Sequence, residues 1–259
     1  MLHYPRTPGG RMWEFFVLPA IIIVGIFLVL RFSGVFPSSV AGVSLWGIVH
    51  ASLLTVGRLF IAYVFALVCA IPLALLATHS RLAQKILLPL FDILQSVPIL
   101  AFFPILVVLF LSIGFTDGAA IFILFITMLW SIVFALIGGV GLIPREITYA
   151  AEVFGIKGFS YFRRILLPSI IPQMVVGSIL AIAQGWNIII VAEVVRTYLP
   201  ASSTVQNLYG IGSLLVSAAA QGNNNLFIAA LGAAVFIIAL VNFFIWQNLL
   251  RYAQRFKFE

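Results

Sequence analysis

Two charged side chains stand inside apolar stretches of this sequence that are long enough to cross a bilayer. They are Arg58 and Glu193. A charge at mid-membrane costs roughly 2.5–3.5 kcal/mol on insertion scales, so each of them needs a partner or a function. We expect that the two pair with each other, or that one of them faces an aqueous pathway. The alternative is a purely structural ion pair, or a side chain that reaches to the membrane surface.

Uncharged polar groups occur near the middle of the apolar stretch that contains Glu193, at Gln184, Trp186 and Asn187. Amide donors suit the passage of an anion, because a conducting pathway must bind its solute weakly enough to release it. A carboxylate suits it poorly, so any specificity for an anion is expected to lie away from Glu193. The alternative for Gln184 and Asn187 is hydrogen bonding to neighbouring helices, and the sequence alone does not separate the two.

Catalytic and metal-binding constellations are not visible. The sequence has no Ser/His/Asp arrangement and no paired carboxylates within one plausible pocket. His3, His50 and His79 lack the spacing of metal ligands. The phosphate-binding pattern G-x-x-x-x-G-K-[ST] does not occur. We therefore expect a protein that is not an enzyme, with no metal and no cofactor of its own.

Composition explains where these residues must sit. The chain of 259 residues is 63% hydrophobic and 8% charged, and its mean hydropathy is +1.22. This is too little polar surface to cover a water-soluble globule, so the solvent of the fold must be lipid. A net charge of +7 is compatible with nucleic-acid binding, but the basic residues form no single stripe. A nucleic-acid partner is therefore not expected.

The apolar stretches predict an all-α, polytopic membrane protein with six transmembrane helices. A span needs roughly 20 mostly apolar residues, and it must be helical because lipid cannot satisfy free backbone groups. Small residues at every fourth position of the fifth stretch predict close helix packing; these are Gly177, Ala181 and Gly185. The expected spans are 14–32, 51–77, 86–113, 118–141, 169–195 and 225–250.

Basic residues predict the orientation of these spans, since cytoplasmic loops carry the excess of Lys and Arg. With the N-terminus inside, only Arg31 and Arg196 fall outside, and both termini are cytoplasmic. Three units are predicted along the chain. Residues 1–49 comprise an N-terminal tail, the first helix and an outer connector, and residues 50–250 form a five-helix core that includes the cytoplasmic loop 142–168. Residues 251–259 are a C-terminal tail. The basic residues assigned to the cytoplasm are Arg6, Arg11, Arg81, Lys85, Arg145, Lys157, Arg163, Arg164, Arg251, Arg255 and Lys257.

The loop 142–168 is polar and has internal structure. A short helix is expected over Glu146–Phe154, and Gly155 permits a turn that a residue with a β-carbon would resist. A second helical piece, Lys157–Leu167, is expected to end at Pro168, which cannot continue the hydrogen-bond ladder. A plain basic loop that serves only topology is the alternative.

The spacing within this loop resembles that of the inner-membrane permease subunits of ABC importers. Their motif is Glu-Ala-Ala, three residues, Gly, nine residues and Ile-x-Leu-Pro. The family's Glu corresponds to Tyr149 here, and Glu146 and Glu152 are the nearest carboxylates. The segments 36–46, 50–110 and 185–195 are similar to the nitrate/sulfonate/taurine branch. The matching residues of the loop are Ala150, Ala151, Gly155, Ile165, Leu167 and Pro168.

The resemblance implies a type I importer permease fold with a cytoplasmic coupling helix within 149–160. It implies a plasma (inner) membrane location in a prokaryote. The implied partners are a second permease subunit (the same or a different chain), ATPase subunits that carry ATP and Mg²⁺, and an extracytoplasmic solute-binding protein. The residues expected to contact the ATPase are Tyr149, Ala150, Ala151, Glu152, Gly155, Ile156, Lys157, Gly158, Ile165, Leu167 and Pro168.

The implied cargo is a small anion such as nitrate, a sulfonate (taurine) or bicarbonate. A permease of another ABC branch, for amino acids, metals or phosphonates, would keep the mechanism and change the cargo. A secondary transporter that acts alone would require acidic residues deep in its spans. An intramembrane enzyme would require a catalytic constellation within them.

Overall fold

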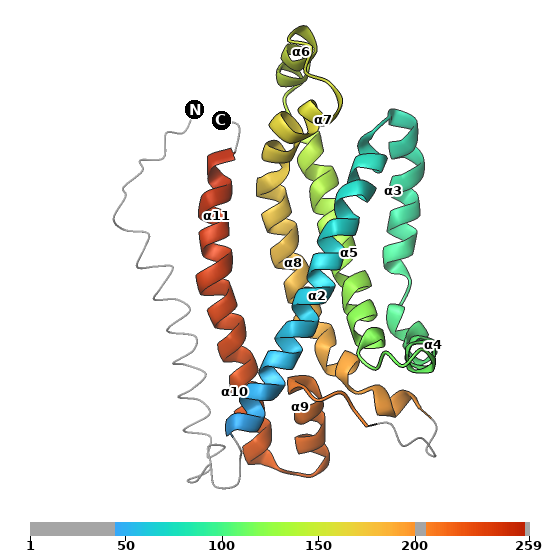
Figure 1. The fold of residues 1–259 in the computed structure, drawn as a ribbon, viewed down its shortest axis with the longest axis vertical. Coiled ribbons are helices and arrows are strands. Elements are labelled where there is room, and N and C mark those ends of the chain that lie inside the picture. The colour runs from blue at the N-terminus through green and yellow to red at the C-terminus, as the bar shows by residue number, and fades with distance from the viewer. Residues whose placement is uncertain (1–44, 200–205, 257–259) are drawn as a thin grey trace, which may run out of the picture.

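The structure is a computed structural model, and it describes residues 45–199 and 206–256. The predicted first span, 14–32, lies outside them. Within these ranges every regular element is a helix (Figure 1), as predicted. The α-helices are α2 (Leu45–Thr78), α3 (Arg81–Ser96), α4 (Ile99–Ser112), α5 (Gly118–Gly141), α6 (Arg145–Val153), α7 (Gly158–Tyr161), α8 (Leu167–Glu193), α9 (Ile211–Ala220), α10 (Asn224–Val241) and α11 (Gln247–Ala253).

Four continuous helical stretches of the described chain are long and apolar enough to cross a membrane. They contain the predicted spans 51–77, 118–141 and 225–250 and nearly all of 169–195. Most run beyond the predicted ends, because hydropathy marks the lipid-embedded part of a helix and not its capped or polar ends. The stretches are Leu45–Thr78, Gly118–Gly141, Gly158–Glu193 and Asn224–Phe256.

The predicted continuous span 86–113 is wrong. The chain breaks between α3 and α4, and the two helices are bent by 76°. Pro98 causes the break: it has no N–H to donate, and it forces the preceding residue out of helical geometry. Val97 is accordingly extended, with φ −66° and ψ 125°. Counted as one bent span, this pair raises the number of possible spans in the described residues to five.

The expectation that Pro168 ends a helix is also wrong. A π-helical turn over Phe162–Leu166 joins α7 to α8, and Pro168 lies in the first turn of α8. A π-turn shifts the hydrogen-bond register by one residue, so the N–H that proline lacks is not missed there. The helix therefore runs without a stop from the loop 142–168 into the membrane.

Helix α5 is the centre of the core, between α2 and α8. Its side chains Ile123, Met128, Ile132 and Leu136 are fully buried. Alanines at four-residue intervals on α2 pack from one side. On the other side, a Cβ added at Gly177 of α8 would lie 2.6 Å from the Cβ of Ala135. Small residues let these backbones approach closely, which fixes the walls of the site described next.

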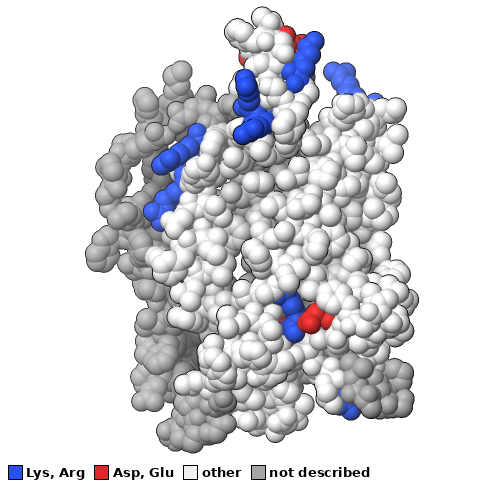
Figure 2. Space-filling model, viewed as in Figure 1, with Lys and Arg blue, Asp and Glu red and all other residues white. Residues whose placement is uncertain are grey.

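The molecule is elongated, with α6 projecting at one end and α9 lying at the other (Figure 1). Lys and Arg side chains gather at the end that carries α6 (Figure 2). On the face drawn in Figure 2, the surface between the two ends carries a single cluster of basic and acidic groups and is otherwise uncharged, which suits contact with lipid.

Candidate functional site

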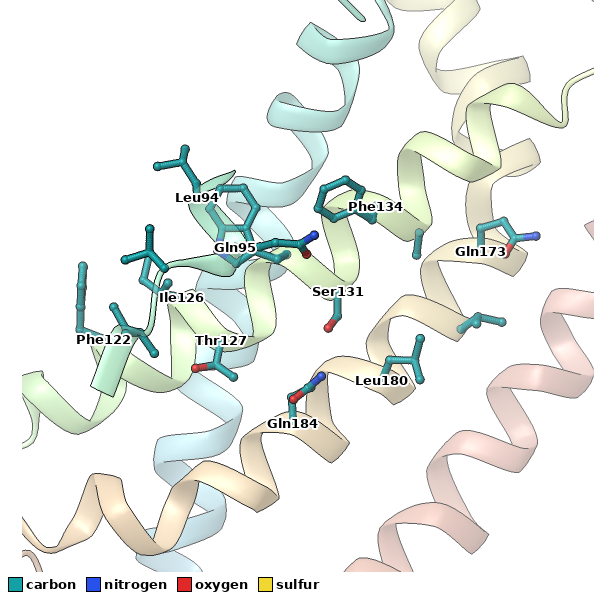
Figure 3. A pocket seen from close by; sticks show the side chains of 15 residues that line it. Leu94, Gln95, Phe122, Ile126, Thr127, Ser131, Phe134, Gln173, Leu180 and Gln184 are labelled. Carbon is teal, nitrogen blue, oxygen red and sulfur yellow. The ribbon is translucent and has the colours of Figure 1, made fainter. Parts of the chain in front are cut away.

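A groove of about 740 Å³ opens between α5, α8 and the bend that joins α3 to α4. Its polar side chains come from three helices (Figure 3). They are Gln95 at the end of α3, Thr127 and Ser131 on α5, and Gln173 and Gln184 on α8. Apolar side chains such as Leu180, Phe122 and Phe134 form the rest of the lining.

Helical spacing explains why these residues share the groove. Thr127 and Ser131 are four residues apart and therefore lie on one face of α5. On α8 the lining residues Gln173, Val176, Leu180 and Gln184 follow one another at intervals of three or four. Helices α5 and α8 therefore each turn a face that carries polar side chains toward the groove, and the opposite face toward the core.

Several of these polar groups are available to a solute or to water. Thr127 donates its hydroxyl to the Ile123 carbonyl at 2.7 Å, which leaves only its oxygen as an acceptor. Gln173, Gln184 and Ser131 have no hydrogen-bond partner in the part of the chain that the structure describes. No Asp, Glu, Lys or Arg occurs among the described lining residues. The groove therefore offers neutral donors and acceptors.

The three residues singled out near mid-membrane are separated by the structure. Gln184 lines the groove. Trp186 packs against the main apolar core, and Asn187 is exposed but is not among the lining residues. Sequence reasoning missed the other polar lining residues. Thr127 and Ser131 could have been found, because their four-residue interval puts two polar side chains on one face of a helix. Gln173 and Gln95 have no other polar lining residue at such an interval in the sequence.

Arg58 and Glu193 do pair, but neither lines the groove, and the pair lies against the start of α9. Arg58 Nη1 donates to Glu193 Oε1 at 2.8 Å, and its Nε donates to Asp117 Oδ1 at 2.6 Å. The Glu193 side chain is fully buried, whereas that of Asp117 is 43% exposed. Asp117 was not predicted, because it precedes a span and so carries no hydropathy signal.

Glu193 also organises the start of α9. Its Oε2 accepts from the Gly212 N–H at 2.7 Å, and its Oε1 accepts from the Thr55 hydroxyl at 2.7 Å. A carboxylate beside the first N–H groups of a helix satisfies donors that have no partner inside the helix. The charge pair therefore ties together α2, the end of α8 and the start of α9, and Asp117 adds the start of α5.

The predicted coupling segment, 149–160, consists of the end of helix α6, a turn at Gly155 and the beginning of helix α7. Helix α6 follows Pro144, and Gly155 and Gly158 have φ of +67° and +58°, a conformation that favours glycine. The predicted helix over Glu146–Phe154 and the turn at Gly155 are confirmed. The Ile156 N–H donates to the Ala151 carbonyl at 2.8 Å, which closes the turn.

The outer surface of this segment is apolar and uncovered. Tyr149, Val153, Phe154 and Phe159 are between 59% and 83% exposed. Ala150 is exposed, whereas its neighbour Ala151 is 3% exposed and faces the body of the molecule. Glu152 and Lys157 are exposed at the surface, yet they also line, with Ile156 and Gly158, a cavity of about 780 Å³ behind α6. Ile165, Leu167 and Pro168 are half-buried at the start of α8.

Fold and site together define a multi-pass helical membrane protein with a neutral polar groove and a projecting apolar helix at its basic end. A family model described as "Binding-protein-dependent transport system inner membrane component" matches residues 70–254. The chain belongs to this family of ABC transporter permeases.

Two curated relatives have cargo in their names. The nitrate import permease protein NrtB of Leptolyngbya laminosa is 32% identical over 60% of this chain and 55% of its own length. The bicarbonate transport system permease protein CmpB of Synechocystis sp. is 31% identical over 75% of this chain and 64% of its own length. The chain thus spans between about half and two thirds of the curated relatives it matches.

A solved structure shares the fold. A chain of the MetNI methionine ABC transporter, in inward-facing conformations, is 18% identical and has a TM-score of 0.67. The match covers 81% of this chain and 97% of that chain. At this identity the likeness concerns the fold alone.

Proposed function

We propose that this chain is the pathway-forming membrane subunit of an ATP-driven importer for a small oxyanion of the nitrate or bicarbonate kind. The observation that carries the proposal is the groove between α5 and α8, whose described lining is polar and uncharged. An ion-conducting route must replace part of the hydration shell without holding the ion. Amide N–H groups from Gln173 and Gln184 and the hydroxyl of Ser131 supply such weak contacts.

The uncharged polar lining of the groove and the names of the relatives support this cargo. Nitrate and bicarbonate are small planar ions with several acceptor oxygens, which suits amide and hydroxyl donors on two facing helices. A neutral lining also excludes strong capture of a cation. A second permease subunit, of the same or a different sequence, closes the open side of the groove in this proposal.

The energy is supplied by a separate ATPase subunit that binds ATP and Mg²⁺. The exposed side chains Tyr149, Val153, Phe154 and Phe159 are its proposed contact, because a large uncovered apolar patch on a projecting helix marks a protein-binding surface. The end with α6 is cytoplasmic in this proposal, as its cluster of Lys and Arg favours. Both termini lie on that side, in the inner membrane of a prokaryote.

Transport then follows from a two-state element. Nucleotide bound by the ATPase and a loaded solute-binding protein each favour one of two packings of the permease pair. The rigid continuity of α7 with α8 links the α6 end to the groove, since one helical stretch runs from Gly158 to Glu193. A shift of the coupling segment therefore moves Gln173 and Gln184 directly.

Reconstitution tests this function. The permease is purified with its ATPase, placed in proteoliposomes and supplied with the solute-binding protein outside. Uptake of labelled nitrate and bicarbonate is measured with and without ATP, beside methionine and taurine at equal concentration. Uptake of one inorganic oxyanion that needs both ATP and binding protein is expected. Uptake by the chain without the ATPase, or uptake of an amino acid alone, would refute the proposal.

A further inference from the structure

A further, smaller cavity lies at the basic end of the molecule, beside the start of α8. It measures about 330 Å³. Arg164, in the π-helical turn before α8, and Arg255, near the end of the last helical stretch, both line it. The two arginines are 91 positions apart in sequence, and the packing of the last helices against α8 brings them to one cavity.

Both guanidinium groups are exposed and uncompensated. Neither forms an ion pair with an acidic residue in the described chain, and no Asp or Glu is among the described lining residues. The hydroxyl of Ser169 donates to the Ile165 carbonyl at 2.6 Å, so the positive charge of the cavity comes from the arginines. Two guanidinium groups around one space match the oxygens of a phosphate.

The remaining walls are apolar. Ile147 of α6, Ile165, Pro168 and Phe256 complete the lining. Apolar walls do not stabilise a free, fully hydrated anion, because they cannot form hydrogen bonds with it or with its water. A site for a phosphate that carries a glycerol and acyl chains would use them, because the chains need an apolar surface beside the charged group.

The length of the last helical stretch places the cavity at headgroup depth. Asn224–Phe256 has 33 residues, or about 50 Å at 1.5 Å per residue. The hydrocarbon core is about 30 Å thick, which leaves roughly 10 Å at each end if the helix is centred. Arg255 thus falls in or just beyond the headgroup layer, while α6 projects further from the membrane (Figure 1).

We propose that the cavity between Arg164 and Arg255 binds the phosphate headgroup of an anionic phospholipid of the surrounding leaflet. Basic pockets between transmembrane helices bind such headgroups, and each arginine near the surface adds to the attraction. The exposed tip of α6 is the surface that suits a protein partner, and the cavity lies at its base. Since Ile147 belongs to α6, a bound lipid would also contact the helix that projects toward that partner.

The test compares two double variants with the same loss of charge. R164Q/R255Q removes both cavity arginines. R163Q/R251Q removes one residue next to Arg164 and one residue a turn before Arg255, neither of which lines the cavity. Lipid retained by the purified full-length chain in detergent is counted by native mass spectrometry after titration with phosphatidylglycerol or phosphatidylcholine. Inorganic phosphate is added as a competitor in a separate arm.

The wild type and R163Q/R251Q are expected to retain phosphatidylglycerol over phosphatidylcholine. R164Q/R255Q is expected to bind phosphatidylglycerol roughly 25-fold more weakly, at about fivefold per arginine. An equal loss of phosphatidylglycerol binding in the two variants would overturn the proposal, because it would mean that the lipid is attracted by the overall positive charge of this end and not by the cavity. Displacement of the lipid by millimolar phosphate would overturn it in favour of a free-anion site. Unchanged lipid binding with lost ATPase capture would assign the arginines to the protein partner instead.

Discussion

Arg58 on α2 and Glu193 at the end of α8 form a buried ion pair, with 2.8 Å between Nη1 and Oε1. The two residues are 135 positions apart, and the pair joins α2 to the last residue of α8 beside the start of α9. Glu193 accepts from Thr55 and Gly212 as well, so its charge is shared among three helices. A pair of this kind holds α2, the end of α8 and the start of α9 in a single arrangement.

Breaking the pair from one side is expected to be costly. Arg58→Leu leaves the fully buried Glu193 carboxylate without its cation, which should lower the free energy of unfolding by about 3–5 kcal/mol. Asp117→Asn should lower it by about 1 kcal/mol or less, since the Asp117 side chain is 43% exposed and keeps water. Both are measured by denaturant titration in detergent micelles.

Glu193→Gln separates structure from transport at the same site. Glutamine keeps the shape and the acceptor oxygen for Gly212, so assembly should survive at a reduced stability. If ATP-driven uptake per folded transporter is also unchanged, the pair is structural only. Equal stability of Arg58→Leu and the wild type would contradict the role of the pair altogether.

Gly212 should tolerate no side chain. A Cβ there would lie 2.7 Å from the Cα of Ile190 and 2.9 Å from the Ile189 carbonyl oxygen, which are backbone atoms that cannot turn aside. Gly212→Ala is expected to lower the free energy of unfolding by about 1–3 kcal/mol through overpacking. Gly232→Ala is the control, because nothing lies within 4 Å of its Cβ position in α10.

That control should be neutral or should stabilise by up to about 1 kcal/mol, since alanine favours the helix more than glycine does. The thermal midpoints of the two variants in the same detergent are compared. Identical shifts would show that α9 does not pack against α8 as closely as the structure has it.

The turn at Gly155 should be needed for partner binding and not for folding. Its φ of +67° costs a residue with a β-carbon about 1–2 kcal/mol, although no atom lies within 4 Å of the Cβ position. Gly155→Val is therefore expected to weaken retention of the ATPase about tenfold, and Gly155→Asn less, because asparagine tolerates this conformation better.

Gly222→Val carries the same backbone cost at the other end of the molecule, with φ +64° and open space around it. It should reduce stability to a similar extent and leave ATPase retention unchanged. Retention is measured by co-purification at graded ATPase concentrations. Equal loss of retention in Gly155→Val and Gly222→Val would mean that global stability, and not the turn, governs partner binding.

Some parts of this architecture follow from sequence and others do not. The span 118–141 coincides with α5, since its apolar run begins directly after Asp117 and ends before a polar loop. The turn at Gly155 was predictable because only glycine suits that backbone. The break at Val97–Pro98 was missed, because a hydropathy window averages over a single proline whose neighbours are apolar.

The site was predictable only where a charge or an amide interrupts an apolar run. Arg58, Glu193 and Gln184 carry that signal. Asp117 does not, since an acidic residue before a span is unremarkable, and its place beside Arg58 depends on how α2 and α5 pack. Thr127 and Ser131 are common residues in membrane helices, so only the groove itself distinguishes them.

A negative charge in the groove should slow anion uptake. Gln184→Glu replaces a neutral donor by a carboxylate beside the proposed route, where like charges 4 Å apart repel by about 1 kcal/mol in water and about 4 kcal/mol near a protein surface. The catalytic efficiency of uptake should therefore fall by about tenfold or more. Asn187→Asp makes the same change of charge three residues further along α8, outside the groove, and should have little effect.

Uptake is measured in proteoliposomes at several ionic strengths, with ATPase retention as the check on assembly. Added salt should not restore the uptake rate of the Gln184→Glu variant fully, because the repulsion between two charges in a groove between helices is screened less than on an open surface. If Asn187→Asp is the slower variant, the solute passes along the Asn187 face of α8. The groove between α5 and α8 would then be a packing feature, and the assignment of the pathway would have to move to that face.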